Sequence, residues 1–282
     1  MNPNLFIIGV QKSGTTSFHN WLGNHLEICV DSSLKDKHTV FSDDYKSIYQ
    51  KAFEKCNARY YLDASVNYFY YHRFFIEKVS KSNKVIVFIR NPIQRAISAY
   101  KYNYMNGRDN RGLNNALDYD WRDTQDLQIT HYNSNLTYVE HGLYYRRICD
   151  LKEKYGDNLK IFILEEIIND KNTFINEINS FLKIELHRDI PKDNISKNTK
   201  SYYLSMFINN ENWLKENMKK IIGKDISKKI AMFVDKLNKT NDVSIKISDD
   251  LNRRLLSYYK SDIISLSKLL NRDLFKIWDI SK

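Results

Sequence analysis

The apolar residues of this chain gather in short unbroken runs, and each run is followed by a longer segment with helical periodicity. The clearest runs are Leu5–Ile8, Val85–Ile89 and Leu159–Leu164. Short continuous apolar runs are typical of strands that are covered on both faces of a parallel sheet. Because these runs alternate with segments whose apolar residues recur three and four apart, the pattern predicts βαβ units and an α/β fold.

The predicted elements cover most of the chain. In order, they are a strand, glycine loop and helix at 4–26, a strand at 59–62, a strand and helix at 84–104, a strand at 159–164, and helices at 173–182, 212–222, 225–237 and 249–270. The part after Pro191 is therefore largely helical. The stretch 106–137 is polar, aromatic and poorly periodic, so we expect an irregular insertion of the kind that often carries specificity.

Composition indicates a folded, water-soluble protein. Of the 282 residues, 42% are hydrophobic and 28% are charged, and only three are proline and eight glycine. Without a linker-like stretch, a single domain spanning 1–282 is the simpler expectation. No apolar run is long enough to cross a bilayer, and Lys12 closes the N-terminal run too early for a signal peptide. We therefore expect a cytoplasmic location.

The cysteines support the same location. Cys29, Cys56 and Cys149 are odd in number and widely spaced, which is typical of reduced thiols in a cytoplasm. None lies near histidines at metal-ligand spacing, so we expect no metal site.

The formal net charge of +10 favours anionic partners, but basic and acidic residues are interleaved along the chain. A solvated basic surface explains the charge equally well. No basic stripe alternates with aromatic residues, so nucleic acid is not an expected partner. The sequence carries no signal for the oligomeric state.

A first anion site is predicted directly after the N-terminal strand. The loop and helix start read Gly9-Val10-Gln11-Lys12-Ser13-Gly14-Thr15-Thr16-Ser17. Glycine lets backbone amides approach an anion, and a helix that opens near Thr15 or Thr16 aims its free N–H groups at the anion. Lys12 adds a full charge, although each hydroxyl alone is also explained by helix capping. A Walker loop has its lysine after the last glycine, whereas here Thr15 follows Gly14, which disfavours an ATP- or GTP-dependent kinase.

A second anion site is predicted after the strand at 85–89. It reads Arg90-Asn91-Pro92-Ile93-Gln94-Arg95-Ala96-Ile97-Ser98-Ala99-Tyr100. Open α/β sheets bind ligands at the carboxyl ends of their strands, where Arg90 lies, and Pro92 suits the first turn of a helix. We expect Arg90 and Ser98 to converge on one anion. Arg95 either shares that face with Ser98, or is a surface charge or a structural partner of an acid.

The two loops together resemble a known family. Residues 11–16 look like the 5′-phosphosulfate loop of sulfotransferases that use 3′-phosphoadenosine 5′-phosphosulfate (PAPS), and 90–100 is similar to their 3′-phosphate motif. His141-Gly142-Leu143-Tyr144 and residues 270–278 more weakly resemble the bacterial and glycan-modifying branch. The resemblance implies a P-loop-like parallel sheet flanked by helices, with a largely helical C-terminal part.

The resemblance also implies the chemistry. PAPS would be the donor, adenosine 3′,5′-bisphosphate (PAP) the product, and the acceptor a hydroxyl of a glycan or glycolipid, or alternatively of a small lipophilic alcohol or phenol such as a sterol. Lys12 would stabilise the leaving oxygen and residues 13–17 would hold the phosphosulfate. The loop at Lys200 would either close over the nucleotide, as a late loop does in the family, or form a plain surface loop.

The base that accepts the acceptor's proton is left open between two residues. Asp36 and His38 occupy the places of the acid and the histidine in the family's corresponding segment, while Thr39-Val40-Phe41 departs from its Phe-Phe pair. A histidine titrates near neutrality and suits base work, whereas Asp36 also reads as part of a solvated Lys-Asp-Lys run. Asp63-Ala64-Ser65 resembles the segment that lines the acceptor side, and it reads equally well as a plain strand end. The aromatics of 68–71 read as packing residues.

Overall fold

The computed structural model describes residues 1–34, 38–117, 137–186 and 247–280, together with the isolated positions 198–199, 226, 230, 233–234 and 239–240. These residues form two compact units, the first comprising 1–95, 141–194 and 257–282 and the second 96–140 and 195–256. The single domain spanning 1–282 remains a prediction.

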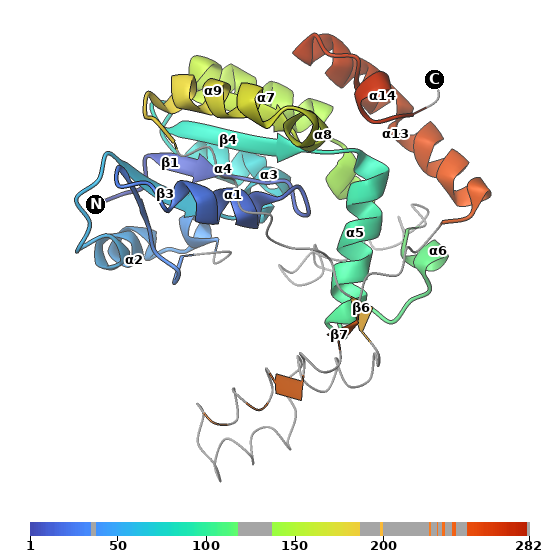
Figure 1. The fold of residues 1–282 in the computed structure, drawn as a ribbon, viewed down its shortest axis with the longest axis horizontal. Helices are drawn as coiled ribbons and strands as arrows, with labels where there is room; N and C mark the ends of the chain where they lie inside the picture. Colours follow the sequence, from blue (N-terminus) through green and yellow to red (C-terminus); the bar gives the residue numbers. More distant parts are fainter. Residues whose placement is uncertain are drawn as a thin grey trace. The chain divides into compact units, whose positions relative to one another are not determined.

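The first unit is built on a parallel sheet of five strands in the order β2-β3-β1-β4-β5. The strands are β1 (Leu5–Ile7), β2 (Ile28–Val30), β3 (Tyr60–Ala64), β4 (Lys84–Ile89) and β5 (Leu159–Ile163). Figure 1 shows β1, β3 and β4 running side by side. Because β1 lies between β3 and β4, the loops that follow these strands meet at one edge of the sheet.

Helices cover both faces of this sheet. On one face, Phe18 of α1 (Thr15–Leu22) packs against Phe174 of α9 (Lys171–Leu182), with ring centroids 5.2 Å apart. On the other face, Phe75 of α4 (His72–Lys78) packs against Phe6 and against Tyr155 of α7 (Tyr145–Tyr155). The inward-facing aliphatic and aromatic side chains are fully buried, and each such burial stabilises the fold by about 1.5–3 kcal/mol.

The structure describes further helices in the two units. They are η1 (Thr39–Phe41), α2 (Tyr45–Ala52), α3 (Asn67–Tyr70), α5 (Pro92–Met105), α6 (Leu113–Ala116), η4 (Glu140–Gly142), η5 (Gly156–Asn158), α8 (Leu164–Asn169), α13 (Asp249–Leu270) and α14 (Leu274–Ile277). In the second unit, β6 (Asn198–Thr199) and β7 (Lys239–Thr240) form an antiparallel pair. Also in that unit, buried Asp109 accepts hydrogen bonds from Arg111 and from the Tyr138 hydroxyl, each at 2.7 Å.

The predicted fold class is confirmed. Four predicted strands are present, and α13 has the predicted bounds. The helix predicted at 173–182 begins two residues earlier, because Asp170 caps it by accepting from the Thr173 amide at 3.0 Å. The helix predicted at 212–222 lies outside the described residues, and of 225–237 only 226, 230 and 233–234 are described, all helical.

The expectation of three reduced thiols is wrong for one pair. Cys29 and Cys56 form a disulfide, with their Cα atoms 6.1 Å apart, and Cys149 is free. Cys29 lies in β2, and Cys56 lies shortly before β3, the strand that pairs with β2. The sheet therefore brings together two cysteines that are 27 residues apart in sequence.

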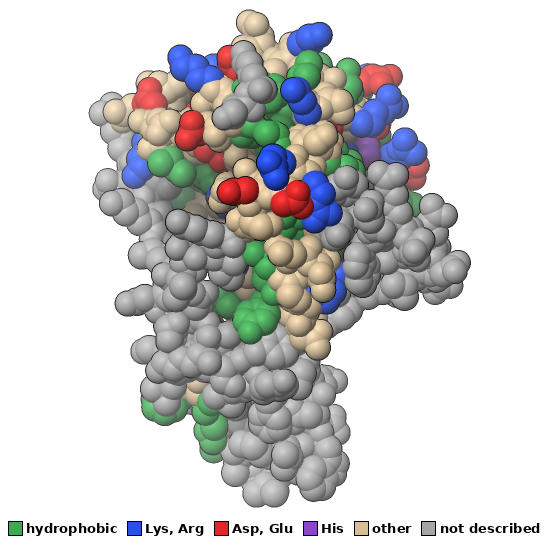
Figure 2. All heavy atoms as spheres, turned by 90° about the vertical axis from the view of Figure 1, so that its right-hand side faces the viewer, with side chains coloured by type: hydrophobic (Ala, Val, Ile, Leu, Met, Phe, Trp, Pro, Cys, Tyr) green, Lys and Arg blue, Asp and Glu red, His purple; other side chains and the backbone are tan. Residues whose placement is uncertain are grey.

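The surface agrees with the interleaved charges of the sequence. On the face shown in Figure 2, acidic and basic side chains of the described residues lie among one another rather than in a patch of one sign. Among the described helices, none combines the length and the apolar character that a bilayer crossing requires.

Candidate functional site

The loop after β1 is pressed against its neighbours in a way that requires glycine. Gly9 has φ +145°, and a Cβ there would lie 2.8 Å from the Cβ of Phe69. The Val10 amide donates to the Phe88 carbonyl at 2.7 Å, which continues the pairing of β1 with β4. Gly14, the residue before α1, has φ +82°. Left-handed backbone is readily available only to glycine, so both turns depend on it.

The start of α1 presents hydrogen-bond donors. No side chain caps this helix, and the Phe18 amide makes the first backward bond, to the Gly14 carbonyl at 3.1 Å. The N–H groups of Thr15 and Thr16 come before that bond and point out of the helix end. Ser13 is fully buried, and none of the described residues gives its hydroxyl a hydrogen-bond partner. A buried hydroxyl without a partner costs roughly 1–3 kcal/mol, which a bound ligand would recover.

Arg90 joins the second loop to the first. It follows β4, and its Nη1 donates to the Lys12 carbonyl at 3.0 Å. Burial lowers the pKa of the Lys12 ammonium, and the nearby charge of Arg90 lowers that pKa further. Burial also lowers the pKa of Arg90, and the charge of Glu165 opposes this. Two partly desolvated cations side by side favour an anion between them.

The backbone of Arg90 is fixed from two sides. The Tyr144 hydroxyl donates to the Arg90 carbonyl at 3.0 Å, and the amide of the next residue, Asn91, donates to Glu165 Oε1 at 3.0 Å. Asn91 also starts α5, because its Oδ1 accepts from the amides of Ile93 and Gln94. Among the described residues, the Arg90 Nε has no partner. Its guanidinium thus keeps donor capacity for a ligand.

The two later residues of this motif lie in different surroundings. Arg95 is fully buried. Burial raises the pKa values of the Tyr144 and Tyr259 hydroxyls, and the charge of Arg95 only partly opposes this rise. Arg95 is therefore an interior residue rather than a surface charge. Ser98 is half-buried in α5 and belongs to the second compact unit.

Of the two candidate bases, only His38 is described. Asp36 and Lys200 lie outside the described residues. The His38 amide donates to Ser65 Oγ at 3.1 Å, and its ring lies edge-on to Tyr68 with centroids 6.1 Å apart. Ser65 follows β3, the neighbour of β1, so the His38 segment lies at the same sheet edge as the Lys12 loop.

From the sequence, Asp63 was interpreted either as part of an acceptor-side segment or as a strand end, and Tyr68 as a packing residue. Asp63 is fully buried and accepts hydrogen bonds from the hydroxyls of Tyr49 and Tyr68, the latter at 2.7 Å. The Tyr68 hydroxyl in turn accepts from the Val40 amide at 3.1 Å. Burial, and then the Asp63 charge, raises the pKa of Tyr68 far above its usual range. Asp63 therefore holds residues 38–40, the His38 segment, through Tyr68. The signal for this role in the sequence was an acid at the end of an apolar strand, close to tyrosines.

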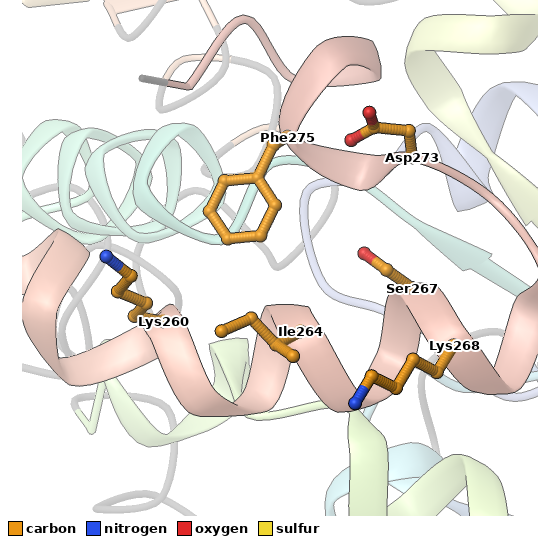
Figure 3. Close-up of a pocket in the computed structure, with 6 residues that line it drawn as sticks. All are labelled: Lys260, Ile264, Ser267, Lys268, Asp273 and Phe275. Carbon is orange, nitrogen blue, oxygen red and sulfur yellow. The ribbon is translucent and has the colours of Figure 1, made fainter. Parts of the chain in front are cut away.

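A separate pocket lies between α13 and α14, with a volume of about 440 Å³ (Figure 3). Its lining residues are Lys260, Ile264, Ser267, Lys268, Asp273 and Phe275. Within the described ranges, no three His, Cys, Asp or Glu side chains gather as they would around a metal ion.

Comparisons with known proteins give one consistent result. A family model described as the sulfotransferase domain matches residues 2–246. A sulfotransferase from Alicyclobacillus acidocaldarius has a similar fold, with a TM-score of 0.65, 19% identity, and coverage of 98% of this chain and 99% of that chain. A mouse sulfotransferase complexed with PAP aligns with a TM-score of 0.49 and 15% identity, over 93% of this chain and 84% of that chain. No curated protein matches the sequence.

Proposed function

Because this chain belongs to the sulfotransferase family, we propose that it moves a sulfuryl group from PAPS to a hydroxyl of a glycan or glycolipid. The observation that carries the donor proposal is the 3.0 Å contact between Arg90 and the Lys12 carbonyl. It places two cationic loops at the ends of adjacent strands. PAPS carries a 5′-phosphosulfate and a 3′-phosphate, so its two ends need two such loops.

The residues present fit this donor. Lys12, the buried Ser13 hydroxyl, and the N–H groups and hydroxyls at the start of α1 would hold the phosphosulfate. Arg90, with Ser98 from the sequence motif, would hold the 3′-phosphate, and Lys200 would close over the nucleotide. Bound PAPS supplies the sulfuryl group and a bisphosphate leaving group.

Lys12 then acts at the oxygen that bridges phosphorus and sulfur. It donates a hydrogen bond, or its proton, to that oxygen as the bond from the oxygen to sulfur breaks. The lowered pKa of Lys12 makes it a better proton donor than an ordinary lysine. Preorganised stabilisation of this kind is worth about 10²–10³ in kcat.

His38 is the base that we propose for the acceptor. It takes the proton from the acceptor hydroxyl while the new oxygen–sulfur bond forms. The support is its fixed place beside Ser65 and Tyr68 at the sheet edge of the Lys12 loop. Asp36 is the alternative that the sequence supplies.

The acceptor class is supported by the resemblance of residues 141–144 to the glycan-modifying branch. A small lipophilic alcohol or phenol is the second candidate, and one observation favours it. Phe41 lies three residues after His38, and its ring centroid is 6.4 Å from that of Phe74. The Phe74 side chain is 60% exposed. An acceptor with an apolar ring would cover such a surface.

The test begins with ligand-induced thermal stabilisation. PAP, adenosine 5′-phosphate and ATP with Mg²⁺ are compared, and PAP is expected to raise the melting temperature most, because a ligand at 100 times its Kd adds about 2.7 kcal/mol. Selective stabilisation by ATP would favour the kinase alternative instead. Acceptor pools of glycans, sterols and phenols with labelled PAPS then identify the acceptor.

Substitutions separate the roles of the two loops. Lys12→Ala is expected to lower kcat at least 100-fold, whereas Arg90→Ala mainly raises KM for PAPS. Lys51→Ala removes an exposed lysine of α2 and serves as the control with wild-type turnover. Wild-type kcat in Lys12→Ala would contradict the proposed chemistry.

A further inference from the structure

Three hydrogen bonds link Trp278 near the C-terminus, Glu165 of α8 and Asn91, the residue after Arg90. The Trp278 indole Nε1 donates to Glu165 Oε2 at 3.1 Å, and the Asn91 amide donates to Glu165 Oε1 at 3.0 Å. Asn91 Nδ2 donates to the Trp278 carbonyl at 3.1 Å, which closes the ring of contacts. We call Asn91, Glu165 and Trp278 the clasp.

The clasp is mostly buried and well supported. Asn91 and Trp278 are 8% and 4% exposed. Trp278 directly follows α14, and its ring lies edge-on to that of Tyr144 with centroids 6.4 Å apart. Tyr144 donates to the carbonyl of Arg90. Trp278 therefore contacts both side chains, Tyr144 and Glu165, that hold the peptide unit between Arg90 and Asn91.

The clasp also holds Glu165, an acid whose charge acts on Arg90. A carboxylate beside an arginine competes with any anionic ligand for its donors. Glu165 uses both of its oxygens on the N–H groups of Asn91 and Trp278. The guanidinium of Arg90 instead donates to the Lys12 carbonyl, and its Nε keeps a donor for a ligand.

We propose that the clasp is a positioning device that holds Arg90 in the orientation that binds the 3′-phosphate of the donor. The inference rests on the proposed function, because it needs PAPS as the ligand of Arg90. Trp278 lies beyond residues 2–246, which the family model matches, so family membership does not assign it a role.

The test compares two nucleotides that differ only in the 3′-phosphate. Trp278→Phe keeps an aromatic ring and removes the indole N–H. Its Kd for PAP is expected to rise about tenfold, as for the loss of one hydrogen bond to a charged group, and its Kd for adenosine 5′-phosphate is expected to stay within about twofold. KM for PAPS should rise while kcat is retained, since Lys12 is untouched.

Two further variants make the result specific. Asn91→Ser keeps a side chain that caps α5 and removes the donor to Trp278, so the same loss of preference for PAP is expected even if Trp278→Phe folds poorly. Phe275→Leu is the matched control, because this buried aromatic of α14 faces the pocket of Figure 3 and makes no clasp contact. It should leave the ratio of the two Kd values unchanged.

The outcomes separate the two proposals. Wild-type enzyme with equal affinity for the two nucleotides would overturn the proposed function, and this inference with it. Wild-type preference for PAP that persists in both Trp278→Phe and Asn91→Ser would overturn the inference alone. Equal weakening of both nucleotides in these variants would likewise reduce the clasp to a structural contact.

Discussion

Removing the Tyr68 hydroxyl tests how the candidate base is held in place. In Tyr68→Phe the ring is kept, so the packing of the aromatic cluster is retained. Two hydrogen bonds are lost, the donation to Asp63 at 2.7 Å and the acceptance from the Val40 amide at 3.1 Å. Tyr49→Phe is the matched control, because its hydroxyl donates to the same carboxylate.

The expected magnitudes follow from burial. Asp63 is fully buried, and a hydrogen bond to a charged group contributes about 1.5–3 kcal/mol. Tyr49→Phe should therefore destabilise the enzyme by that amount. Tyr68→Phe also leaves the amide of Val40, a residue that is 2% exposed, without its acceptor, which adds about 1–3 kcal/mol. We expect a total of about 3–5 kcal/mol.

Urea unfolding followed by tryptophan fluorescence measures both losses, at equal m-values. Turnover supplies the second readout. The Val40 amide lies two residues after His38, so kcat should fall more in Tyr68→Phe than in Tyr49→Phe if His38 is the base. Equal stability losses in the two variants, within about 0.5 kcal/mol, would refute the reasoning, since the Val40 contact would then contribute nothing.

Three further predictions follow from other parts of the molecule. Gly9→Ala should lower the free energy of unfolding by about 3 kcal/mol, because Gly9 has a left-handed backbone and lies close to Phe69. Gly112 has open space around it, so Gly112→Ala should lower that free energy by less than about 1 kcal/mol, and thermal melts compare the two variants. Reduction of the Cys29–Cys56 disulfide, or Cys29→Ser, should lower the free energy of unfolding by roughly 3–4 kcal/mol, because the two cysteines are 27 residues apart. Thiol titration of the denatured chain without a reductant should find one thiol, not three. Burial lowers the pKa of His72 below 6.5 despite its hydrogen bond to Asp150, so the unfolded chain binds more protons than the folded chain. The free energy of unfolding should therefore decrease as the pH falls from about 6.5 towards the folded pKa. His72→Gln should flatten this pH dependence in unfolding measurements.

Most of the sheet could be predicted because each strand is a short, mostly apolar run in the sequence. Val85–Ile89 is apolar at every position, and β4 is buried on both faces. The strand β2 was missed because only three residues, Ile28–Val30, pair in it, which is too short a run to stand out. The helices between 45 and 78 are rich in tyrosine and lysine, and tyrosine packs at buried and exposed positions alike, so their periodicity is weak.

The positions of the two candidate anion loops after β1 and β4 could be predicted for the same reason. Gly9, Lys12 and Gly14 lie within six residues, and Arg90 directly follows its strand. The contacts that hold these loops are not local. Asn91 lies 74 residues from Glu165 and 187 from Trp278, and no periodicity connects such positions. The disulfide was missed for the same reason.

Under the proposed function, selection of the nucleotide is expected to depend on these non-local contacts more than on the glycine loop. A helix N-terminus with one lysine binds any phosphate or sulfate group, so the loop at 9–17 alone gives little discrimination between PAP and ATP. Discrimination requires a second cation at a fixed distance from the first, and an arginine with a long flexible side chain is fixed only at an entropic cost. The contacts of Tyr144 and Glu165 hold the peptide unit between Arg90 and Asn91 before the ligand arrives, so less of that cost falls on binding. It follows that substitutions around Trp278 should change which nucleotide is preferred, whereas substitutions in the loop at 9–17 should change how fast the sulfuryl group moves.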